Sequence, residues 1–262
     1  MSKMPSLFIG HGTPMNTLHH NEYTEAWRQL GQKLPRPRAL LVVSAHWCLG
    51  ESAVTAMAAP RTIHDFYGFP KELFDFDYPA KGDPALAQQV SELAKPISVS
   101  LDHEQWGLDH GAWSVLAHMY PNADIPVVQL SIHAQETLDY HLELAAKLAP
   151  LRDEGVMILG SGNVVHNLRA MQRQAAGQGY DWAERFDEAV VQQMTTAPGD
   201  FVNVLRHPDY ANAVPSPDHL IPLIYVAGVA AAEDSQLEVL TRGCTMGAIS
   251  MTSFGLGAQS YL

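Results

Sequence analysis

Cysteine, basic residues and long apolar runs are all scarce in this chain. Only Cys48 and Cys244 occur among 262 residues, so no disulfide framework is expected, and the low count suits a reducing compartment. The longest apolar stretch, residues 220–232, contains Pro222 and is shorter than a membrane-spanning helix of roughly 20 residues. No apolar leader with a cleavage site precedes the first strand-like segment. We therefore expect a cytoplasmic protein with no membrane partner.

Positive charge is also in short supply. The 16 Lys and Arg residues are outnumbered by 28 Asp and Glu residues, which gives a formal net charge of -12. Such a chain repels nucleic-acid phosphates, so we expect no nucleic-acid partner. Charged residues make up 17% of the chain and hydrophobic residues 47%, enough to bury one large core. Because no internal repeat or linker-like boundary occurs, residues 1–262 are predicted to form a single domain.

Short β-branched runs bounded by turn residues alternate with segments of helical periodicity. Strands are predicted at residues 6–9, 39–44, 54–57, 126–131, 156–159 and 247–251. Helices are predicted over residues 22–34, 85–93, 138–151 and 182–194, with Asn21 as an N-cap and Pro84 at a first helical position. This alternation predicts an α/β fold, a single domain whose central, mostly parallel sheet is flanked by helices. The stretch 59–82, rich in proline and aromatic residues, is predicted to be a long, ordered and functional loop.

Histidine is the residue in excess, and three of the 13 histidines follow predicted strands. His11 comes two residues after the first strand, His46 two residues after the second, and His166 a few residues after the strand at 156–159. The carboxyl ends of parallel strands share one edge of a sheet, where ligands bind. A lone histidine is more often a buried ring bonded to a carbonyl, but three in the same relation to three strands favour a metal site at this edge. Imidazole suits Zn(II), Fe(II), Cu(II) or Ni(II), and not Mg²⁺ or Ca²⁺.

The remaining histidines have weaker contexts. His219 lies in a proline-stiffened loop before an apolar segment. His110 lies among glycines and tryptophans, which indicates a turn bordering a pocket, with Asp109 orienting a ring. His64, in the aromatic loop, is equally suited to a pocket and to the surface. The others are predicted to be solvated: His19, His20, His103, His118, His133, His141 and His207.

The Gly160-Ser161-Gly162 segment places a serine after a strand, as in a nucleophile elbow. The outer glycines of that Gly-x-Ser-x-Gly pattern are absent, since Leu159 and Asn163 occupy their positions. A tight turn or the close approach of backbone to a ligand explains the two glycines better. Cys48, two residues beyond His46, either joins the metal or is a buried, inert thiol.

Four segments, taken in order, resemble the class III extradiol ring-cleaving dioxygenases. They are Gly10-His11-Gly12-Thr13-Pro14-Met15, Ser44-Ala45-His46-Trp47, Gly107-Leu108-Asp109-His110-Gly111 and Gly160-Ser161-Gly162-Asn163-Val164-Val165-His166-Asn167-Leu168. The Ile63-His64-Asp65-Phe66 loop and the segment 217–223 are most similar to the 4,5-DOPA extradiol dioxygenase branch of that family. Each motif is short, but together they cover essentially the whole chain, so the resemblance is specific.

The resemblance implies a central, mostly parallel sheet and one non-haem metal ion per chain, Fe(II) for activity or Zn(II) as bound. It implies that His11, His46 and His219 lie on the metal and that His166 lies at or beside it. Other class III enzymes have a glutamate as the third ligand, so His219 departs from their pattern. The implied substrates are a catechol such as DOPA and O2, which would make the protein an oxidoreductase that incorporates both oxygen atoms.

Coordination numbers divide the four candidate metal-binding histidines, His11, His46, His166 and His219. A six-coordinate Fe(II) that binds both catechol oxygens and O2 keeps three positions for protein, whereas four histidines would close a tetrahedral Zn(II) site. We therefore hypothesise that His166 is displaced from, or never bound to, the metal of the active enzyme. It would act as general base on the catechol hydroxyl and then as general acid during ring opening.

His110 is expected to hydrogen-bond the bound oxygen or substrate, and the loop residues His64, Phe66 and Tyr67 are expected to line the substrate pocket. The same histidines also suit a zinc-dependent hydrolase or a non-catalytic zinc-binding protein. The sequence leaves the oligomeric state open.

Overall fold

A sheet of eight strands forms the centre of the molecule, in the order β4-β3-β5-β2-β6-β1-β10-β7. The computed structural model describes residues 3–172 and 177–262. The strands of the sheet are β1 (Ser6–Gly10), β2 (Ala39–Leu49), β3 (Ser52–Thr55), β4 (Val99–Asp102), β5 (Val127–His133), β6 (Val156–Gly162), β7 (Glu238–Thr241) and β10 (Ser253–Leu256). A separate two-stranded sheet consists of β8 (Cys244–Thr245) and β9 (Ile249–Ser250).

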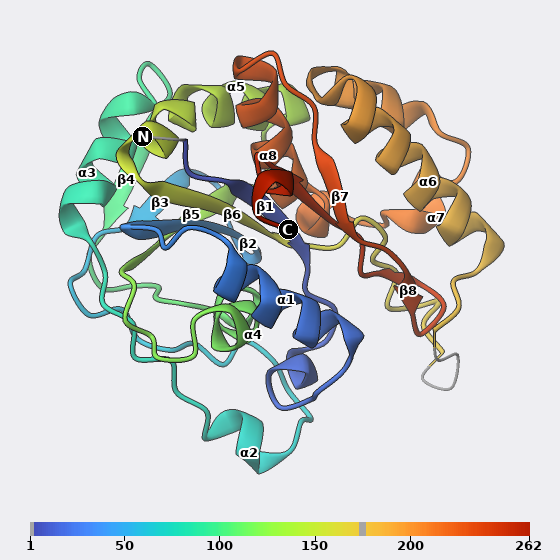
Figure 1. The fold of residues 1–262 in the computed structure, drawn as a ribbon, viewed down its shortest axis with the longest axis horizontal. Helices are drawn as coiled ribbons and strands as arrows, with labels where there is room; N and C mark the ends of the chain where they lie inside the picture. The colour runs from blue at the N-terminus through green and yellow to red at the C-terminus, as the bar shows by residue number, and fades with distance from the viewer. Residues whose placement is uncertain (1–2, 173–176) are drawn as a thin grey trace.

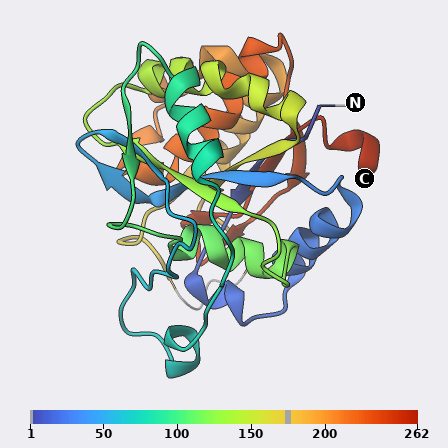
Figure 2. The ribbon, with the colours of Figure 1, turned by 90° about the vertical axis from the view of Figure 1, so that its left-hand side faces the viewer.

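Helices cover both faces of the large sheet, which gives three layers (Figure 1; Figure 2). One face carries α3 (Pro84–Leu93), α5 (Leu138–Leu148), α6 (Asp181–Thr196) and α8 (Ile221–Ala232), and the other carries α1 (Glu22–Lys33) and α4 (His110–Met119). The shorter helices are α2 (Lys71–Phe74), α7 (Tyr210–Ala213), η1 (Pro14–Thr17), η2 (Ala149–Glu154), η3 (Pro198–Arg206), η4 (Pro217–His219) and η5 (Gln259–Tyr261), where η marks a 3-10 helix.

Strand β2 runs through the middle of the sheet and is buried on both faces. Leu41 and Val43 belong to the core under α5 and α8, whereas Leu40 and Val42 belong to the core under α1 and α4. Alternate side chains of a strand point to opposite faces, so one uninterrupted apolar run fills both cores. All four side chains are fully buried. Each such burial stabilises the fold by about 1.5–3 kcal/mol.

The four central strands, β5, β2, β6 and β1, run parallel to one another. Their carboxyl ends therefore share one edge of the sheet. Antiparallel pairings join β3 to β5, β1 to β10 and β10 to β7. The predicted fold class, a single α/β domain with a central, mostly parallel sheet flanked by helices, is confirmed. Within the described ranges, no helix combines the length and the apolar character needed to cross a membrane.

Side-chain caps determine where two of the predicted helices begin. The Asn21 side chain accepts a hydrogen bond from the backbone N–H of Thr24, and the Thr24 hydroxyl accepts one from the backbone N–H of Asn21. This reciprocal pair is a capping box at the start of α1. The Asp83 side chain caps α3 in the same position, and Pro84 occupies the first turn. Both starts agree with the predictions.

Three boundaries need correction. Residues 247–251 do not form a strand of the large sheet, because Met246 and Gly247 have positive φ angles and turn the chain into the β8–β9 pair. The strand that enters the large sheet is β10, a few residues later. β3 begins at Ser52, two residues before the predicted strand. α5 ends at Leu148 and continues as η2, because Pro150 has no N–H to extend the helix.

The sequence pattern predicts neither α4 nor α8. His110 begins α4 instead of lying in a turn, and the Asp109 side chain caps the helix by accepting from the Ala112 N–H. In α8 the ten residues 221–230 are all buried, so it lacks the one-sided apolar stripe by which a helix is usually found. The stretch 59–82 is mainly loop, as predicted, but it contains the short helix α2.

Two histidines predicted to be solvated are buried instead. The Nε2 of His118 bonds to the carbonyl oxygen of Asn16 at 2.7 Å. His141 is 0% exposed, and its Nδ1 lies 3.1 Å from the Tyr225 hydroxyl. Each of these two ring nitrogens has a polar partner, which the sequence context does not indicate, whereas Nε2 of His141 is buried without a hydrogen-bond partner among the described residues. His19, His20 and His103 are exposed as predicted, while His133 and His207 are half-buried.

Candidate functional site

Five histidines from five segments meet at the carboxyl edge of the sheet. His11 follows β1, His46 lies in β2, His110 begins α4, His166 follows β6 and His219 ends η4. All five line one cavity of about 690 Å³. The ring centroids of His46 lie 5.1 Å from those of His11 and 5.0 Å from those of His219. The structure thus brings together every histidine that the sequence assigns to the metal or to catalysis.

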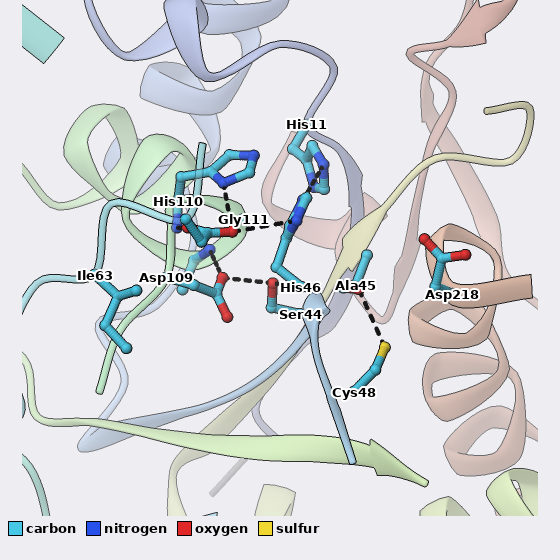
Figure 3. A network of polar contacts seen from close by, with 12 residues as sticks. His11, Ser44, Ala45, His46, Cys48, Ile63, Asp109, His110, Gly111 and Asp218 are labelled. Atoms are coloured by element: carbon cyan, nitrogen blue, oxygen red, sulfur yellow. Dashed lines mark hydrogen bonds and ion pairs between the residues drawn. The ribbon is translucent and has the colours of Figure 1, made fainter. Parts of the chain in front are cut away.

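His46 lies inside β2, at the point where the strand departs from regular pairing. β2 pairs with β5 up to Val43 and again from Cys48, and the register shifts between these two residues. An irregularity of this kind changes the direction of a side chain. At this irregularity the ring of His46 points toward the ring of His11 (Figure 3).

Two glycines allow the segments that carry histidines to approach closely. A Cβ atom on Gly162 would lie 2.1 Å from the backbone oxygen of His219. A Cβ atom on Gly111 would lie 2.3 Å from the Ser44 hydroxyl and 2.9 Å from the ring of His46. Any larger residue at either position would push η4 or α4 away from the sheet edge. Gly162, the last residue of β6, therefore allows the close approach of another backbone segment.

Ser161 anchors the ring of His11. Its hydroxyl donates to the carbonyl oxygen of Gly111 at 2.5 Å and lies 2.9 Å from Nδ1 of His11. Because the single hydroxyl proton is used on the carbonyl, the His11 proton lies on Nδ1 and Nε2 carries the lone pair. Ser161 is 0% exposed, so it acts as an anchor and not as an exposed nucleophile.

Asp65 anchors two rings at once. Its Oδ2 accepts from Nδ1 of His110 at 2.8 Å and lies 3.3 Å from Nδ1 of His46. Its Oδ1 accepts from the backbone N–H of His110 at 3.0 Å. Both rings therefore present Nε2 to the cavity. Figure 3 shows His11, His46 and His110 gathered around the same space.

Asp218 holds His219 in the same way, with 2.5 Å between Oδ2 and Nδ1. The ring of His166 stacks on that of His219, with centroids 3.4 Å apart and planes 7° apart. Among the described residues no hydrogen bond engages a ring nitrogen of His166. Four of the five rings are thus held at Nδ1, whereas His166 keeps both ring nitrogens available.

The donor atoms fit a transition metal. The Nε2 atoms of His11 and His46 are 3.3 Å apart. Two imidazole nitrogens that bind one ion at 2.0–2.1 Å are roughly 3.0–3.4 Å apart. Since Ser161 and Asp65 leave a lone pair on each of these atoms, the two lone pairs repel unless a cation lies between them. Donor atoms lie within 4.8 Å of one another in two groups, His11 with His46 and His110, and His166 with Asp218 and His219.

Burial and mutual repulsion keep three of the rings, those of His11, His46 and His166, neutral. Burial, followed by the neighbouring His219, His110 and His166, holds the pKa of His11 well below its usual range. Burial, followed by His110 and the other rings, does the same to the pKa of His46. Burial and His219 lower the pKa of His166 to about 3. Neutral imidazole is the form that binds metal and accepts protons.

The two anchoring carboxylates are ionised. Burial raises the pKa of Asp65, but the hydrogen bond and charge of His110 outweigh it and hold this pKa below its ordinary value. Burial likewise raises the pKa of Asp218, and the hydrogen bond from His219 outweighs it in the same direction. An ionised carboxylate is a strong acceptor, so the hydrogen-bonded rings of His110 and His219 are fixed firmly.

Of the three loop residues assigned to the substrate pocket, only Tyr67 lines the cavity. Tyr67 is 94% exposed and stands at the rim. Phe66 packs edge-to-face against His110, with centroids 5.6 Å apart, and lies behind the cavity wall. His64 bonds to the carbonyl oxygen of Phe76 at 2.8 Å. Other parts of the wall are apolar side chains, among them Met15, Phe69, Leu168, Met171, Met246 and Ile249.

Asp109 and Cys48 have roles other than those considered from the sequence. Besides capping α4, the Asp109 carboxylate accepts the Ser44 hydroxyl at 2.6 Å and the Trp106 indole N–H at 3.2 Å. It therefore braces α4 against β2, whereas the ring of His110 is oriented by Asp65. Cys48 is exposed, and its thiol donates to the carbonyl oxygen of Ala45 at 3.4 Å.

Three anchors, Ser161, Asp65 and Asp218, are not predicted from the sequence. Each lies in a segment that carries a candidate histidine or a glycine turn, and Asp218 directly precedes His219. Metal-binding histidines commonly donate their second ring N–H to a carboxylate or another polar group, so an Asp or Ser near each candidate histidine could have been predicted as its anchor.

Comparison with known proteins gives a family match over almost the whole chain. The family described as the catalytic LigB subunit of aromatic ring-opening dioxygenase matches residues 4–257. A 4,5-DOPA dioxygenase extradiol from Escherichia coli (strain K12) is 49% identical over 262 residues, covering 98% of this chain and 96% of that protein. A protein of the same name from Beta vulgaris is 38% identical, covering 95% of each chain. A crystal structure of an uncharacterized protein from Escherichia coli K12 superposes with a TM-score of 0.85 at 46% identity, covering 97% of this chain and 100% of that chain.

Proposed function

Because the chain belongs to the LigB family of catalytic subunits of aromatic ring-opening dioxygenases, we propose that it cleaves catechols such as DOPA by the extradiol route. The resemblance seen in the sequence is confirmed, and the protein is an enzyme of the oxidoreductase class that uses a small aromatic substrate and O2. DOPA as the natural substrate is our proposal, supported by the names of the relatives from two kingdoms of life.

The family is metal-dependent, and we propose that His11, His46 and His219 hold a single metal ion through Nε2. Fe(II) is the proposed metal for activity, and Zn(II) the proposed alternative as the bound ion. When bound, the ion would acidify a catechol hydroxyl and bring the two substrates together. The support is that Ser161, Asp65 and Asp218 leave the Nε2 lone pair of each ring directed at the cavity.

His166 is proposed as the residue that moves protons. Its ring lines the cavity and stacks on His219, so it lies beside the proposed metal ligands. No anchor among the described residues holds either ring nitrogen, so the ring can accept a proton and later donate it without breaking a fixed hydrogen bond. This contrast with the four anchored rings is the observation that carries the proposal. His110 is proposed to hydrogen-bond the bound oxygen or substrate through Nε2.

The cavity suits an aromatic ring. Its volume of about 690 Å³ is within the range of small-molecule sites. The methionines Met15, Met171 and Met246 offer flexible, polarisable contacts to an aromatic face. We propose that Tyr67 contacts the substrate at the rim. His64 and Phe66 support the wall from behind.

A direct experiment tests the reaction. The protein is loaded with Fe(II) without air, and a catechol and then air are added. Uptake of O2 with formation of a yellow, ring-opened product is the expected result. Metal-dependent ester hydrolysis without O2 uptake would instead indicate the zinc hydrolase, and an inert protein with a saturated Zn(II) site would indicate the non-catalytic alternative.

Three histidine variants test the assignment of roles. His166→Ala is expected to keep its metal and lose ring cleavage, and near-full activity would refute its role. His219→Ala is expected to lose the metal, whereas His110→Ala is expected to keep it and to lower the rate. The exposed His103 provides a control, because His103→Ala should match the wild type in metal content and rate.

Location and organisation complete the proposal. We place the protein in the cytoplasm, since Cys48 and Cys244 are both unpaired. We also propose that residues 1–262 act as one catalytic unit. Cell fractionation and the activity of the isolated chain test these two statements.

A further inference from the structure

We infer that Asp65 is a positioning residue that fixes two rings together, the metal-binding tautomer of His46 and the orientation of His110. This inference rests on the proposed function, in which one ring binds the metal and the other contacts substrate or oxygen. One carboxylate would then couple the affinity of the metal site to the geometry of the reaction. Neither the sequence motifs nor the family match assigns a role to this residue.

The loop that carries Asp65 is fixed to the segment that carries His110. The Ile63 backbone N–H donates to the carbonyl oxygen of Leu108 at 2.7 Å, and the Trp113 indole N–H donates to the carbonyl oxygen of Ile63 at 2.9 Å. Leu108 precedes His110 by two residues and Trp113 lies in α4. The loop and the start of α4 therefore move as one body, so the position of Asp65 relative to His110 is set by backbone contacts.

The two oxygens of Asp65 accept two hydrogen bonds from His110 and lie within 3.3 Å of Nδ1 of His46. Oδ1 faces the backbone N–H of His110, and Oδ2 faces Nδ1 of both His110 and His46. The side chain is only 13% exposed, so water cannot easily replace a lost partner. A carboxylate is the side chain that can accept at both of its ends. The site therefore requires two acceptor atoms at this position.

An amide cannot satisfy this arrangement. In Asp65→Asn, an amide nitrogen at the Oδ1 position would face the His110 N–H, donor against donor. An amide nitrogen at the Oδ2 position would face both ring Nδ1 atoms, and each ring would have to move its proton to Nε2. A His46 ring with its proton on Nε2 cannot bind the metal there, and the wrong tautomer of a catalytic histidine has large effects on rate.

The experiment compares Asp65→Asn with Asp77→Asn. Asp77 lies in the same long loop, and its Oδ1 accepts from the Thr62 hydroxyl at 2.6 Å, a bond that an amide oxygen can also accept. Each apoprotein is titrated with Co(II), whose visible spectrum reports the ligands, and its affinity for Zn(II) is measured by competition with a chelator. The Fe(II) form of each variant is assayed with a catechol for kcat and KM.

We expect Asp65→Asn to bind Zn(II) 10- to 100-fold more weakly, to show an altered Co(II) spectrum, and to lose at least tenfold in kcat at saturating metal with a smaller change in KM. Asp77→Asn should stay within about twofold of the wild type in every measurement. A folded Asp65→Asn protein with wild-type affinity, spectrum and kcat overturns the inference. If the wild type binds metal but cleaves no catechol, the proposed function fails, while the Zn(II) and Co(II) measurements still decide the role of Asp65.

A measurement on the wild type covers the case in which Asp65→Asn does not fold. Long-range ¹H–¹⁵N correlations of the Zn(II)-loaded protein report which ring nitrogen carries the proton in each histidine. The inference requires the proton on Nδ1 in both His46 and His110. A proton on Nε2 of His46 overturns it.

Discussion

The anchor of His11 gives the sharpest quantitative prediction. In Ser161→Ala the imidazole Nδ1 of His11 loses its acceptor and the carbonyl oxygen of Gly111 loses its donor, both in a fully buried setting. Loss of such a partner lowers metal affinity about 10- to 100-fold, which is about 1.4–2.7 kcal/mol. The two unpaired buried groups should lower the free energy of unfolding of the apoprotein by about 1–3 kcal/mol.

Ser6 supplies the matched control. It is also fully buried, and its hydroxyl donates to the carbonyl oxygen of Ile158 at 3.0 Å, which joins β1 to β6 with no histidine as a partner. Ser6→Ala therefore removes a hydroxyl-to-carbonyl bond of the same kind. It should lower the free energy of unfolding by about 0.5–1.5 kcal/mol and leave metal affinity unchanged.

Two measurements separate the effects. Urea unfolding of the metal-free proteins gives the stability of each variant, and competition with a coloured chelator gives the Zn(II) affinity. The reasoning fails if Ser161→Ala binds Zn(II) as tightly as the wild type. It also fails if Ser6→Ala loses as much affinity as Ser161→Ala, since general loss of stability would then account for both.

Three further predictions concern stability, packing and the rim of the cavity. Burial lowers the pKa of His141 to about 4, below the value of about 6.5 in the unfolded chain, so the unfolded state takes up the proton first as the pH falls. The free energy of unfolding should therefore fall by about 3 kcal/mol as the pH drops from about 6.5 to 4. Urea unfolding of His141→Gln should show a shallower fall over the same pH range. Gly162→Ala should destabilise the protein by about 1–3 kcal/mol or more in thermal unfolding and reduce its metal content, because the new Cβ would meet the backbone of His219. Gly50→Ala is the control: it has open space around it and should change stability by less than about 1 kcal/mol in the same assay. Tyr67→Ala should raise KM for a catechol and leave the free energy of unfolding within about 0.5 kcal/mol, since the side chain is 94% exposed, and an unchanged KM would remove Tyr67 from the substrate contacts.

Local signals predict the parts of the fold in which neighbouring residues determine the outcome. The uninterrupted apolar run of β2 and the cap at Asn21 are such signals, and both elements begin where they are predicted, although β2 continues past residue 44 to Leu49 and so includes His46. Apolar residues surround the whole of α8, so the spacing of its apolar residues does not reveal a helix. The short edge strands β4 and β7 are only half-buried along most of their length, so they lack the apolar run of a buried strand. These elements are determined by what packs on them.

The candidate site divides in the same way. His11, His46 and His166 are found from the sequence because each lies near or beyond the carboxyl end of a strand that the sequence reveals, and parallel strands share one edge. The anchors are not found, because Asp65 meets His110 across 45 residues of chain and Ser161 meets His11 across 150. Which way a loop carboxylate points depends on contacts such as those of Ile63 with Leu108 and Trp113, and these exist only in the folded protein.

The wide spacing of the five histidines has a consequence for how the protein folds. The first lies at position 11 and the last at position 219, and η4 reaches its place only when it packs against the end of β6. During synthesis the chain must therefore be extended past residue 219 before all five rings can meet, and a partly folded intermediate that lacks η4 would lack part of the cluster. Contacts between such distant segments close late and slowly. Tight metal uptake during refolding should accordingly follow the slowest folding phase.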